Sequence, residues 1–187
     1  MTVNVKRDLR RKLRSLAGDE AARRRESAAV CDHILACAAY QNAKLIAGYI
    51  PLGHEVDIRP LLRHALAQGK LLALPRCGDA PHMTFHLVKS LDELVKGKFG
   101  IPEPSACAQV ISTEMIEFLI VPLEGVDLKG NRLGKGGGYY DAALTAYQGF
   151  SLGCAFSWQI VPAVPVNEWD RRLNACAEAT GIRYFSS

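Results

Sequence analysis

The sequence predicts an α/β fold with a parallel sheet, and two observations lead to that prediction. Residues 44–50 and 70–74 are short apolar runs, which are typical of strands buried on both faces. Residues 57–68 lie between them with the apolar spacing of a helix, so the three segments form a strand, helix, strand unit with short connections. No repeat, low-complexity segment or linker interrupts residues 1–187, and we expect a single domain.

The composition describes an ordinary globular chain. It has 187 residues, of which 49% are hydrophobic and 22% charged, which excludes disordered and fibrous classes. Lys and Arg number 23 against 19 Asp and Glu, so the formal net charge is only +4. A dedicated nucleic-acid binder is usually far more basic, and we therefore expect no nucleic-acid partner. Separately, we expect the chain to be a monomer.

The cysteines and the apolar runs indicate the compartment. Six cysteines, at positions 31, 37, 77, 107, 154 and 176, form neither a CxxC pair nor a zinc-binding spacing, which predicts reduced and mostly buried thiols. The basic start lacks the apolar stretch of a signal peptide. No apolar run approaches the ~18 residues of a membrane span. We expect a cytoplasmic protein with no membrane partner.

Two helices are expected at the N-terminus. Residues 5–16 place apolar side chains at helical spacing among basic ones, at Val5, Leu9, Leu13 and Leu16. Asp19 is a suitable N-cap for a second helix that runs to about Ala39.

The remaining segments continue the α/β pattern. Asp57 is the expected N-cap of the helix at 57–68, and Gly69 is expected to end it. Residues 97–104 are rich in Gly and Pro and predict a shaped loop. Further strands are expected at 82–88, which alternates as a half-exposed strand does, and at 117–122, 152–156 and 174–177.

The most informative segment is the Gly-rich loop that follows the strand at 117–122. Four glycines at 134, 136, 137 and 138 surround Lys135, and Arg132 stands just before them. Such a backbone brings N–H groups close to a ligand, and with two cations beside it suits a phosphate chain. The spacing matches neither a Walker A loop nor GxGxxG. The alternative is a flexible turn between a strand and a helix.

Other polar residues have both a functional and a structural interpretation. Asp141 is expected in the first turn of the helix after the loop, where it either holds a metal that bridges phosphates or only interacts with the helix dipole. Glu55 and His54 lie in a loop after a strand, the usual ligand edge of an open sheet, yet either could simply be solvated. His82 and His86 are better explained as strand residues than as metal ligands.

The sequence resembles the 5-formyltetrahydrofolate cyclo-ligase family, also called 5,10-methenyltetrahydrofolate synthetases. The family hallmark of an Arg, a Gly-rich run, two aromatic residues and an Asp matches RLGKGGGYYD at 132–141. Further matches are KRDLR at 6–10, YIPLGHEVDIRPLL at 49–62, FGIPEP at 99–104 and VPVNEWD at 164–170. The resemblance covers nearly the whole chain.

The resemblance implies a three-layer α/β/α sandwich with a mainly parallel central sheet. It also implies an enzyme that uses ATP and Mg²⁺ to convert 5-formyltetrahydrofolate to 5,10-methenyltetrahydrofolate, with release of ADP and phosphate. ATP would phosphorylate the formyl oxygen, and N10 of the folate would then close the ring. The partners would be these two small molecules.

The resemblance further implies roles for particular residues. Lys135 and Arg132 would be catalytic, and Asp141 and Asp170 would hold Mg²⁺. The folate would contact Ile50, Glu55, Phe99, Lys135, Gly136, Gly137, Gly138 and Tyr139. The nucleotide would contact Lys6, Arg7, Asp8, Leu9, Arg10, Arg132, Leu133, Gly134, Lys135, Gly136, Gly137, Gly138, Tyr139 and Tyr140.

Two departures and two alternatives accompany this interpretation. Glu124 stands where the family pattern favours a small or apolar residue, and AEAT at 177–180 lacks a Thr-Glu pair. One alternative is a binding module for nucleic acid or another anion, with the basic residues at 6–14 and 23–25 as its surface. The other is a sugar-phosphate isomerase on the same fold class, which would need no ATP.

Overall fold

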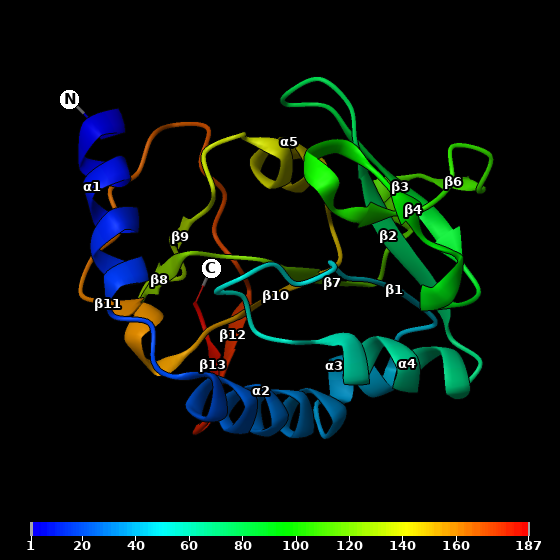
Figure 1. Ribbon diagram of the computed structural model, residues 1–187, viewed down its shortest axis with the longest axis horizontal. Helices are drawn as coiled ribbons and strands as arrows, with labels where there is room; N and C mark the ends of the chain where they lie inside the picture. The colour runs from blue at the N-terminus through cyan, green and yellow to red at the C-terminus, as the bar shows by residue number, and fades with distance from the viewer. Residues whose placement is uncertain (1, 187) are drawn as a thin grey trace.

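The computed structural model describes residues 2–186, without the side chains of residues 2, 3 and 99, and is built around one large sheet (Figure 1). The strand order in this sheet is β13-β12-β10-β7-β1-β2-β3-β6. The strands are β1 (Leu45–Ala47), β2 (Leu71–Cys77), β3 (Met83–Val88), β6 (Val110–Ile111), β7 (Phe118–Val121), β10 (Phe150–Cys154), β12 (Ala175–Glu178) and β13 (Gly181–Tyr184).

The centre of the sheet is parallel and its edges are antiparallel. Strands β12, β10, β7, β1 and β2 pair in parallel, whereas β13, β3 and β6 pair antiparallel to their neighbours. In the middle, Ile46 of β1 lies in register with Leu72 of β2 and Phe118 of β7. The mainly parallel sheet is confirmed.

Helices cover both faces of the sheet, which confirms the three-layer sandwich. Figure 1 shows α2, α3 and α4 on one face and α5 on the other, with α1 at one end of the molecule. The helices are α1 (Thr2–Ser15), α2 (Glu20–Leu35), α3 (Ala38–Asn42), α4 (Arg59–Ala67) and α5 (Tyr139–Thr145), with short 3₁₀ turns η1 (Leu91–Glu93), η2 (Lys98–Gly100), η3 (Thr113–Met115) and η4 (Ser157–Gln159). Among residues 2–186, none of the helices has the length and apolarity needed to cross a bilayer.

Alternation along β7 supplies both halves of the core. Phe118 and Ile120 pack with the buried residues of α2, α3 and α4, while Leu119 and Val121 pack with Leu144 of α5 on the other face. All four β7 residues are fully buried. Successive side chains of a strand point to opposite faces, and here helices cover both faces.

Close packing against α4 explains one glycine. A Cβ on Gly48, just after β1, would come within 2.7 Å of a methyl group of Leu62, so only glycine lets this helix approach the sheet so closely.

The helix at 19–39 is shorter than expected. Asp19 is the N-cap, and its carboxylate accepts a hydrogen bond from the backbone N–H of Ala22 at 2.7 Å. The helix ends at Leu35, however, and Cys37 is the extended N-cap of a separate short helix, α3. The apolar spacing continues across this break, which is why the sequence pattern hides it.

The expected N-cap of α4 is wrong by one position, because Ile58 precedes the helix. Asp57 instead accepts hydrogen bonds from the backbone and the guanidinium of Arg59. Gly69, with φ +72, ends the helix region as predicted. The loop at 97–104 contains η2 and a two-stranded sheet of β4 (Val95–Lys96) and β5 (Pro102–Glu103), so it is more regular than expected.

A third sheet lies under α1 and was not predicted. It has the order β11-β8-β9, formed by β8 (Gly125–Asp127), β9 (Arg132–Leu133) and β11 (Ile160–Val161). Leu13 of α1 packs there with Leu133, Val161 and Val164. Val5 and Leu16, which the sequence pattern placed on the apolar face of α1, are each 52% exposed, so the buried stripe is narrower than expected.

Candidate active site

A cavity of about 400 Å³ lies at the ends of the central parallel strands. Tyr49 and Ile50 follow β1, Cys77 ends β2, and Pro122 follows β7, so several strands converge on it. Open α/β sheets bind ligands at this edge. The cavity is lined by most of the residues that the family resemblance singled out, namely Ile50, Glu55, Arg132, Gly134, Lys135, Gly136, Gly137, Gly138, Tyr139, Tyr140 and Asp141.

The Gly-rich loop joins β9 to α5 and forms one wall of this cavity. Gly136 and Gly138 have φ values of +104 and +73, which other residues adopt only at a cost. A Cβ on Gly134 would approach the Arg132 guanidinium to 2.5 Å. The glycines therefore allow a tight backbone to fit beside a buried arginine, and the loop is a shaped wall of the cavity.

Lys135 reaches across the cavity to Glu55. Its ammonium is 2.8 Å from Oε1 of Glu55 and forms an ion pair, although the approach is not aligned as a directed hydrogen bond. The other carboxylate oxygen of Glu55 accepts from the backbone N–H of Leu52 at 2.8 Å. Glu55 is the more enclosed partner, with only 5% of its side chain exposed against 43% for Lys135. Burial raises the pKa of Glu55, and Lys135 opposes that rise.

Arg132 and Asp141 form a second ion pair at the loop. The Arg132 guanidinium donates to Oδ1 of Asp141 at 2.8 Å and is only 3% exposed. It also lies 6.0 Å from the centre of the Tyr140 ring, a distance suited to a cation–π contact. Its Nε has no hydrogen-bond partner, which leaves a buried donor at the cavity.

The first helix adds two cations to the same region. Arg10 donates from Nε to the carbonyl of Gly134 at 2.7 Å, and burial lowers the pKa of Arg10. Lys6 lies 2.5 Å from Oδ2 of Asp170, with both side chains largely buried. These contacts join segments that are more than 120 residues apart in the chain, since Lys6 and Asp170 are separated by 164 positions and Arg10 and Gly134 by 124.

The departure at Glu124 has a structural explanation. Its buried carboxylate accepts two hydrogen bonds from the Arg14 guanidinium, at 3.0 and 2.6 Å. This bidentate pair raises the pKa of Arg14 and attaches α1 to the strand region beside the Gly-rich loop.

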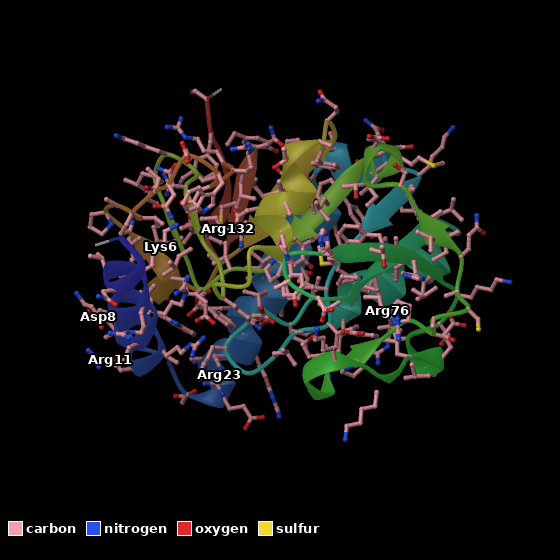
Figure 2. The ribbon with its side chains drawn as sticks, turned by 90° about the horizontal axis from the view of Figure 1, so that it is seen from above. Lys6, Asp8, Arg11, Arg23, Arg76 and Arg132 are labelled. Atoms are coloured by element: carbon pink, nitrogen blue, oxygen red, sulfur yellow. The ribbon has the colours of Figure 1, made fainter. Side chains whose placement is uncertain are left out.

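Several expected site residues lie elsewhere. Figure 2 shows Arg132 near the centre of the molecule and Asp8 at its outer edge on α1. Arg7 and Asp8 are exposed, and Asp8 pairs with Arg11. Leu9 and Leu133 pack in the small apolar cluster under α1 and do not line the cavity. The side chain of Phe99 lies outside the described residues.

Of the two histidines expected in a strand, His86 lies in β3, whereas His82 lies just before it, because β3 begins at Met83. His86 is a buried residue of β3 whose ring bonds to Ala108 and Thr84, and His54 and His82 are exposed. Across the part of the chain that the structure describes, no group of three or more His, Cys, Asp or Glu side chains is placed to hold a metal. All six cysteines are free, and four of them are buried, as expected.

Sequence reasoning missed part of the cavity wall. The missed residues are mostly apolar and come from the ends of the strands and from the loop at 97–104; they include Tyr49, Leu52, Pro75, Cys77, Met83, Ile101, Pro102, Glu103 and Pro122. The usable signal was position, because a residue at the carboxyl end of a buried parallel strand lies at the ligand edge whatever its type.

Comparisons with known proteins identify the family of this chain. The sequence model of the 5-formyltetrahydrofolate cyclo-ligase family matches residues 2–178. A 5-formyltetrahydrofolate cyclo-ligase of Mus musculus is 29% identical over 183 residues, covering 91% of this chain and 89% of that protein. One from Escherichia coli (strain K12) is 32% identical over 142 residues, covering 71% and 76%.

Solved structures show the same architecture. The 5,10-methenyltetrahydrofolate synthetase of Aquifex aeolicus superposes with a TM-score of 0.87 at 31% identity, covering 98% of this chain and 94% of that one. The 5,10-methenyltetrahydrofolate synthetase of Mycoplasma pneumoniae superposes with a TM-score of 0.76 at 19% identity, covering 93% and 98%, and supports the fold. Because the family match spans almost all of the described residues, this chain is an enzyme that belongs to the 5-formyltetrahydrofolate cyclo-ligase family.

Proposed function

We propose that the cavity binds 5-formyltetrahydrofolate and ATP together and produces 5,10-methenyltetrahydrofolate, ADP and phosphate. The observation that carries this proposal is the ion pair between Lys135 and Glu55. It brings the Gly-rich loop, which suits phosphate, next to a buried carboxylate in the same cavity. A carboxylate suits the donor-rich edge of a pterin, and a Gly-rich loop with cations suits a phosphate chain. The two substrates would therefore meet across one cavity.

The reaction needs both substrates in one cavity because the formyl oxygen is a poor leaving group and must first be phosphorylated by ATP. In the proposed reaction this oxygen attacks the γ-phosphorus of ATP, and ADP leaves. N10 then attacks the activated formyl carbon and loses its proton, and the carbon–oxygen bond breaks to release phosphate. Most of the rate enhancement would come from alignment and from cations that neutralise developing charge.

The cations are held ready by partners within the chain. Lys135, Arg132 and Lys6 are paired with Glu55, Asp141 and Asp170, and Arg10 is bonded to the Gly134 carbonyl. We propose that Lys135 and Arg132 turn to the transferred phosphoryl group and that Lys6 and Arg10 bind the nucleotide phosphates. Each cation would exchange a carboxylate or carbonyl partner for a phosphate. Because the cations are already held in the fold, binding would require little further desolvation of their charges.

Two of these partner carboxylates, Asp141 and Asp170, suit a magnesium ion. Mg²⁺ usually takes one or two protein carboxylates together with substrate phosphates, so a third protein ligand is not needed. Asp141 and Asp170 supply hard oxygen donors, and they pair with two cations of the proposed nucleotide site, Arg132 and Lys6. When bound there, the ion would neutralise phosphate charge during transfer.

The nucleic-acid alternative would have only part of its expected surface. Lys6, Arg10 and Arg14 of the basic first helix are bonded to groups of the same chain, while Arg7, Arg11 and Lys12 are exposed. Three of the cations on this helix therefore take part in contacts within the fold. We keep as part of the proposal the expected monomer in the cytoplasm, without nucleic-acid or membrane partners.

The direct test is turnover by the purified chain. With Mg²⁺, ATP and 5-formyltetrahydrofolate present, we expect the near-ultraviolet absorbance of the methenyl product to rise, and we expect no rise when ATP is omitted. A folded protein that makes no product, or that makes it equally well without ATP, would contradict the proposal. Need for ATP also separates it from an isomerase.

The metal assignment is tested with Asp141→Asn. The change keeps the shape but removes one anionic oxygen, so we expect turnover to require a higher Mg²⁺ concentration. The matched control is Asp92→Asn, an exposed residue on η1 outside the cavity, which should leave the requirement unchanged. Reduced thermal stability with an unaltered Mg²⁺ titration would instead make Asp141 only the structural partner of Arg132.

A further inference from the structure

The hydroxyl of Tyr140 is the exception among the tyrosines. All six are described, and five hydroxyls have a partner, whereas the buried hydroxyl of Tyr140 has none. The five satisfied contacts are Tyr40 with His64, Tyr49 with Val56, Tyr139 with Gly78, Tyr147 with Phe150 and Tyr184 with Cys37. A buried hydroxyl that has no partner within the protein and belongs to a cavity-lining residue is available to a bound ligand.

Among the described residues, the buried side-chain atoms without a hydrogen bond gather in one place. Within the described residues, the buried side-chain nitrogen or oxygen atoms without a hydrogen-bond partner belong to Glu55, Arg132 and Tyr140. All three residues line the same cavity. Oε1 of Glu55 is in an ion pair with Lys135, whereas Nε of Arg132 and the hydroxyl of Tyr140 are donors without a partner. Such a cavity suits a polar ligand that accepts from these donors.

Tyr140 enters this cavity as a neutral donor. Burial raises the pKa of Tyr140, and the Glu55 carboxylate adds to the rise, so the proton stays on the hydroxyl at ordinary pH. Arg132 also faces this ring, but its guanidinium is engaged by Asp141. Beside Glu55, therefore, the hydroxyl of Tyr140 is the uncharged group free to donate.

The pterin ring presents a matching series of groups. Its 2-amino group and N3–H are donors, and the neighbouring 4-oxo group is an acceptor. A carboxylate takes the two donors, and the acceptor beside them then needs a donor next to that carboxylate. Glu55 and Tyr140 both line the cavity and lie near enough to interact electrostatically, so together they supply an acceptor and a neighbouring donor.

We propose that Tyr140 is a folate-binding residue whose hydroxyl donates to the 4-oxo group of the pterin while Glu55 binds the adjacent donors. The inference rests on the proposed function and moves Tyr140 from the nucleotide set, where the family resemblance placed it, to the folate. Tyr140 thereby becomes a specificity-determining residue, since its hydroxyl would bind the 4-oxo group, the acceptor beside the 2-amino group and N3–H of the pterin.

The test compares Tyr140→Phe with Tyr147→Phe. Calorimetry measures the Kd of 5-formyltetrahydrofolate without ATP and the Kd of ATP without folate, and a thermal melt measures stability. For Tyr140→Phe we expect about tenfold weaker folate binding, unchanged ATP binding and an unchanged or higher melting temperature. Tyr147 donates to the carbonyl of Phe150 away from the cavity, so its variant should melt lower and bind both ligands normally.

Each other result counts against the inference. Weaker ATP binding with normal folate binding would return Tyr140 to the nucleotide site, and equal losses for both ligands would make its role structural. Full folate affinity in Tyr140→Phe, or no folate binding by the unaltered chain, would also overturn it. A chain that binds 5-formyltetrahydrofolate but never converts it would overturn the proposed reaction and leave this inference standing.

Discussion

Glu55 is a cavity residue whose ionisation depends on its surroundings. Burial raises its pKa above the ordinary 4.5, so the folded chain holds the proton more tightly than the unfolded chain does. This carboxyl therefore contributes stability that is complete below pH 4.5 and is lost as the pH rises through the raised pKa. The proposed pterin binding should have the opposite dependence, because it would need the ionised carboxylate.

We expect Glu55→Gln to remove both dependences. The pH dependence of stability is measured by urea unfolding of the unaltered chain and of Glu55→Gln over a pH series that begins below 4.5. The free energy of unfolding of the unaltered chain should fall, relative to the variant, as the pH rises. Folate affinity should rise with pH in the unaltered chain and be weak and flat in the variant. A stability difference that does not change with pH would contradict the raised pKa.

Lys135 serves both turnover and the neutralisation of Glu55, and a double variant separates the two roles. Lys135→Ala should lower turnover on the order of 100-fold, as loss of a transition-state contact does. It should also lower stability at neutral pH, because the buried Glu55 loses its counter-charge.

Adding Glu55→Gln to Lys135→Ala should restore the stability but not the turnover. Denaturant unfolding measures stability and steady-state kinetics measures turnover, each on the unaltered chain, the two single variants and the double variant. A double variant as unstable as the single one would show that the ion pair does not account for the loss.

Residue type alone identified Lys135 and Arg132 but left Glu55 ambiguous. A glutamate in a loop is usually solvated, and only the folded chain shows that 5% of this side chain is exposed. The family resemblance favoured Glu55, and the geometry supplies the physical reason. Leu133, by contrast, stands within the family motif yet is fully buried in the core.

Among the structural elements, the Gly-rich loop depends on the left-handed conformation of Gly138. This residue has φ +73 and is the N-cap of α5. Gly138→Ala should cost about 1–2 kcal/mol of stability because of the added Cβ. It should also impair turnover, since the strain falls on the loop that carries Lys135.

Gly69→Ala is the matched control. Gly69 has φ +72, and a Cβ there would meet nothing within 4 Å. Gly69→Ala should lose the same stability in urea unfolding, because the backbone strain is the same. Its turnover kinetics should be unchanged. Equal kinetic losses in the two variants would show that lost stability and not loop geometry governs turnover.

The predicted elements were accurate where a periodic pattern is long. The central strands and the helices α1, α2 and α4 were expected near their observed places. Strands β8 and β9, with three and two residues, are too short to show a period, and they were missed. The break between α2 and α3 was also hidden, because an apolar stripe can continue across a change of backbone direction.

Across the whole molecule, the docking of α1 completes the proposed nucleotide site. Leu13 is 3% exposed and fits against Gly125, where a Cβ would come within 2.7 Å of its methyl group. Leu13→Ala should cost about 2–5 kcal/mol. It should weaken ATP binding more than folate binding, because Lys6 and Arg10 lie on this helix and Glu55 does not.

Leu16→Ala provides the comparison, since Leu16 is 52% exposed on the same helix. It should change neither stability nor ligand affinity. Urea unfolding, calorimetry and hydrogen exchange of the α1 amides measure the two variants together. If Leu13→Ala weakened the binding of both ligands equally, α1 would support the whole cavity and not the nucleotide side alone.

Local pattern in the chain was enough to establish the α/β class, the central strands, the Gly-rich loop and its cations, and resemblance was enough to name the family. These properties depend on residues that are close in sequence or on a motif. The pairing of Lys135 with Glu55, of Lys6 with Asp170 and of Arg14 with Glu124 was decided only by the tertiary structure. The unpaired hydroxyl of Tyr140 was decided there too. Burial and ion pairing depend on which distant segments pack together, and a sequence pattern read along the chain does not contain that information.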